Sequence, residues 1–443
     1  MDEKIMNEKI MDEKIMTRYL YLKDEVKISL MFSLLNGKDE EALFWAFELY
    51  HSGFFKELEN YLWQLYYDFY FTLNPSFEAF FLKKQKQKER EKLSGIGCGG
   101  GDAIGEVGGG EEMYIANIVC SLCIRPFTLD VFLLREMTQR ICFELDGDDA
   151  VEAEIFNKLS LRDKMQQVLE SKDYERIALF IMVDLEVYVK DTDTKEWNNL
   201  FDVVLEFFGC INAKKSFEKM VGSVIATDGG VRVRTILLSR ILHFFVLREK
   251  KSKLGKSIYM NVEPYQLEVY KTVESVKEDG KEGCVPRKLL KQLLLYSSNE
   301  HGWLHLFKPN GRIGFGIDGG VGVGVDDEEK RNRDKKEFFW NWMYYASFSP
   351  LWFERIRSGG GKVNHETKTV NFDDDDLFDS FCNLYDYELE EQPCEIQEKC
   401  LPILGLGVGM RMGGWVEFYE EYSNRCKGRE GLYIPSREIL EAF

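Results

Sequence analysis

The stretch Asp39-Glu-Glu-Ala-Leu-Phe-Trp-Ala-Phe-Glu-Leu-Tyr50 decides the fold class. Its centre, from Ala42 to Phe47, is apolar on every side of a helix, and a helix with such a centre is buried between neighbouring elements. Acidic residues open the stretch and Gly53 follows its end, as expected for the start and stop of a helix. The stretch therefore predicts a buried helix from about Glu40 to Tyr50, surrounded by other helices.

Helical patterns continue on both sides of this stretch. One segment runs from Lys23 to about Leu35 and ends at Asn36-Gly37, which is a helix stop. On the other side apolar residues recur at spacings of three and four until Asn74-Pro75 interrupts them: Leu58, Tyr61, Leu62, Leu65, Tyr66 and Phe69. Because the connecting turns are short, these three helices are expected to pack as antiparallel neighbours.

Similar patterns predict further helices along the chain. Thr128 precedes one that contains Met137, and Asp173 precedes one that contains Leu185. Others are predicted near residues 195–208, 215–226, 233–250, 286–296, 335–347 and 350–357. Strands alternating with helices are not evident, and no repeat of fixed length occurs. The predicted fold is mainly α, with stacked antiparallel helical hairpins in a solenoid-like arrangement and glycine-rich flexible inserts.

Glycine is concentrated in four short segments, residues 95–110, 311–324, 359–361 and 405–414, which hold 24 of the 37 glycines. The first two are typical of inserts or linkers. Residues 1–16 repeat a pentapeptide three times, and a period of five matches neither helix nor strand. The predicted organisation is a flexible repeat tail (1–16), an N-terminal helical domain (17–92), a linker (93–111), a central helical domain (112–308), a charged linker (309–334) and an aromatic-rich helical region (335–443).

The charge balance argues against a general nucleic-acid binder. Acidic residues outnumber basic ones by 76 to 58, and the formal net charge is −18. Proteins that bind nucleic acid generally neutralise phosphates with surplus Lys and Arg. A local basic patch remains as an alternative, formed by Arg232, Arg234, Arg240 and the 248–256 cluster.

The sequence predicts an intracellular protein. Its longest strongly apolar run, Ile177 to Val183, is far shorter than the roughly 18 residues that a membrane span requires. The acidic amino terminus lacks the pattern of a signal peptide. The ten cysteines are scattered, which suits reduced thiols better than a disulfide framework.

Two glycine motifs do not qualify as nucleotide-binding signals. Gly314, Gly316 and Gly319 have the spacing of a dinucleotide fingerprint, but the context lacks the preceding strand and following helix that the motif needs. Gly255-Lys256-Ser257 resembles the end of a phosphate-binding loop, yet Lys250 occupies the position of its first glycine. The sequence therefore predicts no cofactor.

Candidate metal ligands are equally sparse. Cys120 and Cys123 have the spacing of half a zinc site, but a structural zinc takes four ligands, and the apolar surroundings favour buried thiols. His301 and His305 are spaced for one helix face without further ligands. The acidic run Asp373–Asp376 lacks the central glycine of a calcium loop and suits solvated acids near a helix terminus. No metal site and no catalytic residue are predicted.

The densest aromatic segment, Phe338 to Phe353, holds nine rings in sixteen residues. Ser349 and Pro350 within it have the pattern of a helix cap and first helical residue. The rings either fill a helical core or leave one face exposed. In the second case a partner-binding hot spot would contain Trp340, Trp342, Tyr344, Tyr345 and Trp352.

Several blocks of the sequence resemble a known family. They are Glu41-Ala-Leu-Phe-Trp-Ala-Phe-Glu-Leu-Tyr-His-Ser-Gly53, Tyr66-Tyr-Asp-Phe-Tyr70, Ile124-Arg-Pro-Phe-Thr-Leu-Asp-Val-Phe132, Tyr344-Tyr-Ala-Ser-Phe-Ser-Pro-Leu-Trp-Phe-Glu-Arg-Ile356 and Ile396-Gln-Glu-Lys-Cys400. They are similar to an uncharacterised helical protein family of nucleocytoplasmic large DNA viruses. The resemblance implies a viral origin and no particular activity, and it carries over no functional residues.

These observations favour a non-enzymatic interaction or scaffold protein of a large DNA virus, acting with a protein partner in the host cytoplasm or within the virion. One alternative is an enzyme with an unrecognised site, for which the polar surroundings of His301 and His305 are a weak indication. The other is a nucleic-acid accessory factor that uses the basic patch described above.

Overall fold

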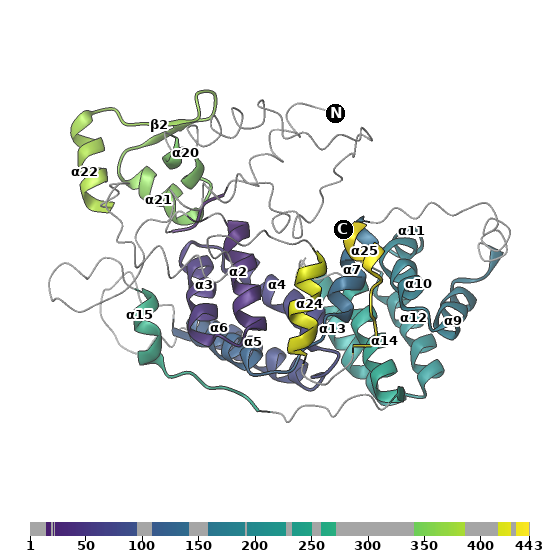
Figure 1. Cartoon of the computed structure of the whole chain (residues 1–443). Coiled ribbons are helices and arrows are strands. Elements are labelled where there is room, and N and C mark those ends of the chain that lie inside the picture. Colours follow the sequence, from purple (N-terminus) through teal and green to yellow (C-terminus); the bar gives the residue numbers. More distant parts are fainter. Residues whose placement is uncertain are drawn as a thin grey trace. The chain divides into compact units, whose positions relative to one another are not determined.

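The computed structural model describes residues 15–18, 21, 23–94, 109–140, 158–190, 193–226, 233–249, 258–271, 341–385, 415–426 and 431–442. Within these residues the chain is mainly helical, with a single two-stranded sheet, so the predicted fold class is confirmed (Figure 1). The solenoid-like arrangement stays a prediction. None of the helices described has the length and apolar character needed to cross a membrane.

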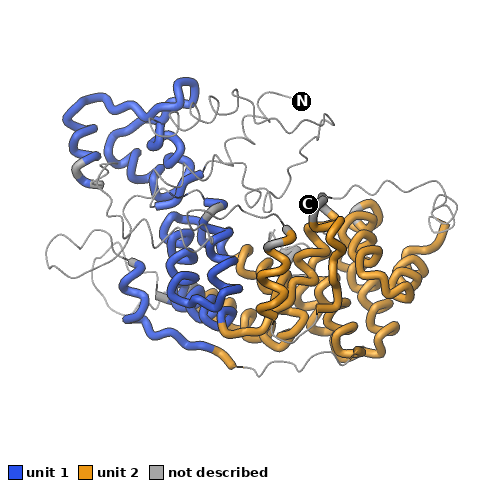
Figure 2. Tube along the Cα trace, in the orientation of Figure 1, with its two compact units in different colours: residues 1–58, 94–123, 260–412 blue, residues 59–93, 124–259, 413–443 orange. Residues whose placement is uncertain are grey.

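The chain divides into two compact units, each assembled from three separate stretches (Figure 2). Unit 1 contains residues 1–58, 94–123 and 260–412, and unit 2 contains residues 59–93, 124–259 and 413–443. The predicted sequential domains do not follow this division. The predicted domains over 17–92 and 112–308 are each shared between the two units, because helices that pack together come from distant parts of the chain.

Unit 1 is built around the stretch that decided the fold class. Its helices are α2 (Lys23–Leu35), α3 (Asp39–His51), the first turn of α4 (Phe55–Leu65), α6 (Gly109–Cys123), η4 (Pro264–Leu267) and α15 (Glu268–Lys271). The predicted burial of α3 is confirmed for Ala42, Leu43, Trp45, Ala46 and Phe47. Helices α2 and α3 pack on each other and on α6. The short turn between α2 and α3 makes them antiparallel.

Gly37 shows why the turn between α2 and α3 needs glycine. Its φ is +67°, a backbone conformation that other residues rarely adopt. A Cβ atom at this position would also lie 3.3 Å from the carbonyl oxygen of Cys123, at the end of α6. The predicted helix stop therefore also permits the close approach of α6.

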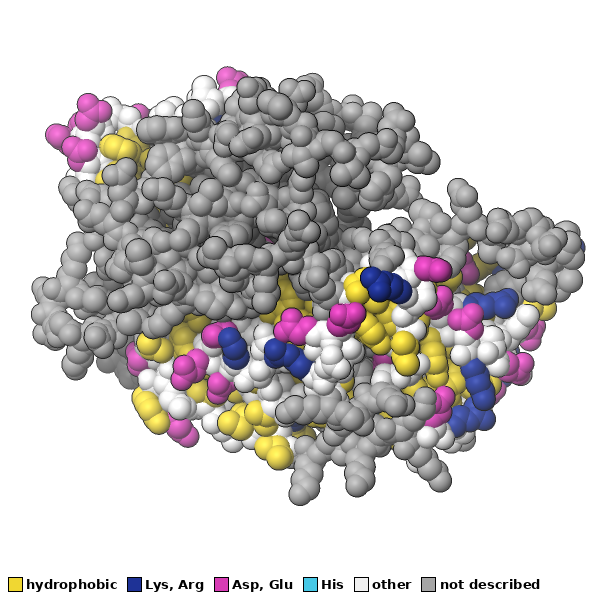
Figure 3. Space-filling view, viewed as in Figure 1, with side chains coloured by type: hydrophobic (Ala, Val, Ile, Leu, Met, Phe, Trp, Pro, Cys, Tyr) yellow, Lys and Arg dark blue, Asp and Glu magenta, His cyan; other side chains and the backbone are white. Residues whose placement is uncertain are grey.

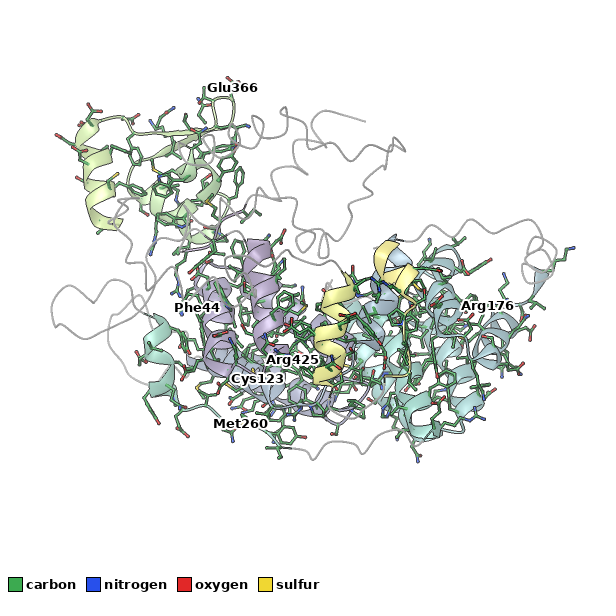
Figure 4. All side chains as sticks on the ribbon, in the orientation of Figure 1. Phe44, Cys123, Arg176, Met260, Glu366 and Arg425 are labelled. Carbon is green, nitrogen blue, oxygen red and sulfur yellow. The ribbon has the colours of Figure 1, made fainter. Side chains whose placement is uncertain are left out.

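A second part of unit 1 is the aromatic module, residues 341–385. It comprises α20 (Trp342–Ala346), α21 (Pro350–Ser358), β1 (Lys362–Asn364), β2 (Thr369–Asn371) and α22 (Asp375–Tyr385). The strands are antiparallel, with Val363 opposite Val370, and Glu366 lies in the turn between them (Figure 4). The hydroxyl of Ser349 accepts the Trp352 amide hydrogen at 3.2 Å, which confirms the predicted start of α21.

Unit 2 surrounds one long buried helix. Its elements are the rest of α4, η1 (Tyr66–Tyr70), α5 (Phe77–Ser94), α7 (Asp130–Arg140), α9 (Leu161–Ser171), α10 (Tyr174–Leu179), η2 (Phe180–Asp184), α11 (Leu185–Tyr188), α12 (Thr194–Phe208), η3 (Ile211–Ala213), α13 (Lys214–Ala226), α14 (Val233–Glu249), α24 (Trp415–Arg425) and α25 (Arg437–Ala442). Helix α14 is buried from Val233 to Val246. It contacts α7, α12, η1 and η2, and two of its buried polar side chains, Arg234 and Arg240, donate hydrogen bonds to neighbouring elements.

The helix starts of unit 2 follow ordinary capping chemistry. Asp173 precedes α10, and its carboxylate accepts the amide hydrogens of Glu175 and Arg176. The carboxylate of Asp193 accepts the amide hydrogen of Glu196 at the start of α12. These bonds satisfy donors that a helix start leaves without partners, and the predicted helix start at Asp173 is confirmed.

Elements η1 and η2 are π-helical turns, which the sequence did not predict. Each continues an α-helix and contains five residues, and all five residues of η1 are buried. Turns of this kind are short and often lie at functional sites or points of strain. In this chain η1 holds Tyr67 and Asp68, which belong to the buried ionic networks described below, and the main-chain carbonyl of Met182 in η2 accepts a hydrogen bond from Arg234.

Asp130, at the start of α7, binds the C-terminal segment 431–442 through hydrogen bonds. Its carboxylate accepts the amide hydrogens of Leu432 and Tyr433 at 3.2 and 3.1 Å. The Tyr433 hydroxyl donates to the Glu175 carboxylate at 3.0 Å. A Cβ atom at Gly431 would lie 2.5 Å from the Asp130 carboxylate, so only glycine permits this approach.

Replacing Asp130 with alanine is expected to release the C-terminal segment from unit 2. Two buried amide hydrogens lose a charged acceptor, and bonds of this kind contribute about 1.5–3 kcal/mol each. Hydrogen exchange of the Leu432 and Tyr433 amides should therefore become much faster. Asp202→Ala, which removes a carboxylate paired with Lys214 at the surface, serves as the control. Equal protection in both variants would contradict the role of Asp130.

Candidate functional site

Four of the five aromatic residues considered for partner binding lie in the core of the aromatic module. Trp342, Tyr344, Tyr345 and Trp352 are buried in one apolar cluster. These four rings therefore belong to a core and do not form an exposed aromatic face, whereas Phe353 of the same segment is 47% exposed. The fifth, Trp340, lies outside the described residues. The rings are buried because the hairpin, α22 and the amino-terminal segment all pack on them.

Residues near the amino terminus complete this core. Met16 is fully buried in the same cluster, and the Trp352 indole nitrogen donates to the carbonyl oxygen of Thr17 at 3.1 Å. Arg18 forms an ion pair with Glu48 of α3 at 3.0 Å. The flexible tail predicted for residues 1–16 therefore includes one residue, Met16, that is part of the folded structure.

Helix α22 presents the most exposed apolar surface of the aromatic module. Phe381 anchors the helix, being buried beside Phe372. Leu377, Phe378 and Leu384 keep 42%, 39% and 70% of their surface exposed. Together these three residues are called the α22 face. Single exposed apolar residues are common on proteins, whereas neighbouring exposed apolar residues mark an interaction surface. Leu377 and Leu384, seven residues apart, lie on the same side of α22.

The surroundings of the α22 face are acidic. The segment Phe372–Tyr385 contains five aspartates and neither Lys nor Arg. Asp373 pairs with Lys362, with distances of 2.6 and 2.8 Å. The remaining four are all exposed: Asp374, Asp375, Asp376 and Asp379. Figure 3 shows acidic side chains beside apolar ones at the upper left, where Figure 1 places α22.

Part of this acidity has a local cause. Asp375 and Asp376 stand in the first turn of α22, where negative charge is favoured by the helix macrodipole. The Asp374 carboxylate accepts the Asp376 amide hydrogen at 3.0 Å. The acidic run therefore starts a helix, as the sequence indicated.

Comparisons of the chain with protein-family models, with curated proteins and with solved structures each gave no match.

A buried ionic network in unit 2 centres on Glu78. Its carboxylate accepts hydrogen bonds from the Tyr67 hydroxyl at 2.8 Å, the Ser216 hydroxyl at 2.6 Å and the Arg240 guanidinium at 2.5 Å. The Arg240 guanidinium also lies over the Phe71 ring, 4.9 Å from its centroid. The buried carboxylate is therefore satisfied by three donors from different elements, and the network ties α5 to η1, α13 and α14.

A second buried pair lies next to the first along η1. Asp68 of η1 receives two hydrogen bonds from Arg135, at 3.1 and 3.0 Å, and Arg135 also contacts Glu136 at 2.9 Å. Burial raises the pKa of Asp68 above its ordinary value, although Arg135 acts in the opposite direction. Burial and the Glu78 carboxylate raise the pKa of Tyr67 well above its ordinary value. The π turn thus carries both networks.

Two arginines of the predicted basic patch are buried and do not lie on the surface. Arg234 and Arg240 are 2% and 4% exposed. Arg234 donates to the carbonyl oxygen of Met182 in η2 at 2.7 Å, and Arg240 pairs with Glu78. Neither can contact phosphates from this position. Arg248 is exposed, while Arg232 and residues 250–257 lie outside the described residues.

The two cysteines with zinc-like spacing are thiols at the end of α6. Cys120 is buried and Cys123 is partly buried, which agrees with the interpretation of buried thiols for Cys120. Burial raises the pKa of the Cys120 thiol to about 12, so it is protonated and unreactive at neutral pH. Across the described ranges, no group of three or more potential metal ligands occurs.

His243 is expected to make the free energy of unfolding of unit 2 depend on pH. Burial lowers the pKa of its imidazole below the ordinary 6.5, as does the nearby Arg240, while a contact of 2.8 Å with the Thr72 carbonyl oxygen raises it. Below about pH 6.5 the unfolded chain therefore binds a proton at this residue that the folded chain does not. The free energy of unfolding of unit 2 should decrease as the pH falls from about 7.5 to 5.5.

Urea unfolding at several pH values checks this, with His243→Phe as the comparison. The variant should show a flatter pH dependence, because it lacks the group that takes up the proton. Burial-raised pKa values of Asp68 and Asp184 act in the opposite sense, and they are common to both proteins. Parallel pH profiles for the two proteins would rule out the effect of His243.

Several sites considered in the sequence lie outside the described residues. They are His301 and His305, the glycine motifs at 314–319 and 255–257, the predicted helix near 286–296, and the glycine-rich segments apart from residues 109, 110 and 359–361. The α22 face was not among the predicted sites. Its signal was present, because Leu377, Phe381 and Leu384 follow the acidic run at helical spacings of four and three.

Proposed function

We propose that this chain is a non-enzymatic interaction or scaffold protein, and that it binds a protein partner through the α22 face. The supporting observation is the exposure of Leu377, Phe378 and Leu384 on one helix of a module that has its own apolar core. Burying exposed leucine and phenylalanine side chains is favourable by up to about 1.5–3 kcal/mol each. A partner that covered the face would gain this free energy.

The aromatic module holds the face in a fixed position. Phe381 of α22 packs against Gly359, where a Cβ atom would lie 2.8 Å from the ring. Gly361 is similarly close to Ile356 and Val370. The first of these close approaches joins α22 to the end of α21, and the second joins α21 to the hairpin. A surface that is already fixed loses little conformational entropy on binding, which favours recognition.

The setting of this function is part of the proposal. The sequence blocks that resemble a family of large DNA viruses support a viral scaffold acting in the host cytoplasm or packaged in the virion. The acidic composition, with a net charge of −18, fits a protein partner better than nucleic acid.

Affinity purification of the tagged full-length chain, after cross-linking in the cells that produce it, tests the proposal. The wild type is compared with Leu377→Ser/Leu384→Ser and with Val187→Ser, a control residue of unit 2 that is 82% exposed. A protein recovered in near-stoichiometric amount with the wild type and the control, but reduced about tenfold with the double variant, would support the proposal. Equal recovery with all three proteins would refute it.

A further inference from the structure

We infer that two copies of this chain can exchange their C-terminal arms, so that the arm of one copy binds unit 2 of the other. The arm consists of α24 and the C-terminal segment 431–442. It binds a site formed by Asp130 and Met137 of α7 and Glu175 of α10, called the Asp130 site. An element exchanged between identical copies repeats in the second copy the contacts that it makes in its own. Arm exchange is independent of the proposed function, because it involves neither the α22 face nor its partner.

The Asp130 site holds the arm in the way that a peptide-binding site holds its ligand. The carboxylate of Asp130, which is 1% exposed, accepts the amide hydrogens of two consecutive residues, Leu432 and Tyr433. The Tyr433 hydroxyl contacts the Met137 sulfur at 3.5 Å and donates to the Glu175 carboxylate at 3.0 Å. In peptide recognition, main-chain hydrogen bonds supply affinity and side-chain pockets supply specificity. The Asp130 site provides both.

The site selects its occupant by sequence. A side chain at the first position is excluded, because a Cβ atom at Gly431 would lie 2.5 Å from the Asp130 carboxylate. Tyrosine is favoured two positions later, because its hydroxyl donates to Glu175. Burial and the Glu175 carboxylate raise the pKa of this hydroxyl, which therefore stays protonated and able to donate. A glycine followed two residues later by a tyrosine occurs once in the whole sequence, at Gly431 and Tyr433. The occupant that this sequence supplies is therefore the arm, from the same copy or from another.

The covalent link of the arm is long enough to reach another copy. In the chain, residues 260–412 of unit 1 separate the arm from the rest of unit 2. The 29 residues from 386 to 414 lie between α22 and α24, and a stretch of this length can span up to about 95 Å when fully extended. Phe418 of α24 adds a contact with Phe132 of α7, with ring centroids 5.8 Å apart. Each of these contacts can form equally well between two copies.

The arm of the same copy competes with the arm of another. A linked arm is present at an effective concentration of up to the millimolar range, so the wild type is expected to be largely closed at micromolar concentration. Two substitutions shift this balance because each damages a different half of the contact. Asp130→Ala removes the acceptor and leaves the arm intact, whereas Gly431→Val places a side chain against the carboxylate and leaves the site intact.

Co-expression of these two full-length variants with different affinity tags tests arm exchange. Only the mixed pair can combine an intact arm with an intact site. Purification through both tags should recover at least about ten times more of the mixed pair than of either variant paired with itself. The mass of the recovered protein should be that of two chains. Wild type paired with wild type should be recovered in small amount, because its arms are closed. Using Asp130→Ala/Gly431→Val in place of Asp130→Ala removes the intact arm from the mixed pair and should abolish the gain.

Hydrogen exchange identifies which arm occupies the intact site. Peptides from the two arms of the mixed pair differ in mass, because one contains Gly431 and the other contains the valine substitution. The Leu432 and Tyr433 amides should be protected in the arm with Gly431, since they donate to Asp130 of the other copy. In the arm with the substitution they should exchange rapidly. Protected amides along α14, the buried helix of unit 2, show that each variant is folded.

Three outcomes would overturn arm exchange. The first is equal recovery of the mixed pair and the self-pairs. The second is rapid hydrogen exchange in both arms of the mixed pair. The third is an association that persists with Asp130→Ala/Gly431→Val, which would place the contact between copies on another surface. If Gly431→Val does not fold, Gly431→Ala takes its place, because its single methyl group already meets the Asp130 carboxylate.

Discussion

Replacing Glu78 with leucine is expected to destabilise unit 2 by about 3–5 kcal/mol, because Arg240 would be left buried without its carboxylate. Both side chains are 5% exposed, so water cannot replace the lost partner. Hydrogen exchange across α14, which carries Arg240, should become correspondingly faster, and unit 2 should unfold at lower urea concentration. Tyr67 and Ser216 would also lose the oxygens to which they donate.

Two further variants make this prediction specific to the buried pair. Glu206→Leu removes the exposed partner of Arg162 and should change stability by less than about 1 kcal/mol. Adding Arg240→Met to Glu78→Leu should recover part of the loss, since an apolar pair can replace a buried ion pair with little cost. Stability in Glu78→Leu equal to that in Glu206→Leu would show that the network contributes little.

Replacing Trp352 with alanine is expected to unfold the aromatic module, with a cost of about 3–5 kcal/mol. Trp352 is fully buried, lies against Trp342 with ring centroids 5.5 Å apart, and donates to Thr17. Its loss would leave a cavity and an unpaired carbonyl group at the centre of the module. Trypsin should then cleave the hairpin rapidly at Lys362 and Lys368.

The neighbouring residue provides a matched control. Phe353 follows Trp352 on α21 and is 47% exposed, so Phe353→Ala should have little effect on cleavage of the hairpin. Similar cleavage rates for the two alanine variants would show that Trp352 does not hold the module together.

Local sequence patterns predicted most helices well. Asn36-Gly37, Asp173 and Ser349-Pro350 mark helix ends in the structure, because turns and caps depend on residues that are close in the chain. The apolar helix from Asp39 to His51 was predicted for the same reason: periodicity and burial are both expressed within a single helix.

Features that depend on distant residues could not be predicted. The rings around Trp352 are buried in part by Met16 and by the Thr17 main chain, more than 300 residues away in the sequence. The strands β1 and β2 contain three residues each, which is too short for an alternating pattern to be recognised. The division of the units at Leu58 falls inside α4, where no local signal marks it.

The π turns affect how this chain aligns with related sequences. Each turn accommodates one residue more than an α-helix does, and one residue corresponds to about 100° of rotation about the helix axis. A relative that lacks η1 or η2 would therefore align with a one-residue gap within Tyr66–Tyr70 or Phe180–Asp184. Alignments that allow single-residue gaps inside these helices, where gaps are normally penalised, should detect distant relatives that ungapped helix matching would miss.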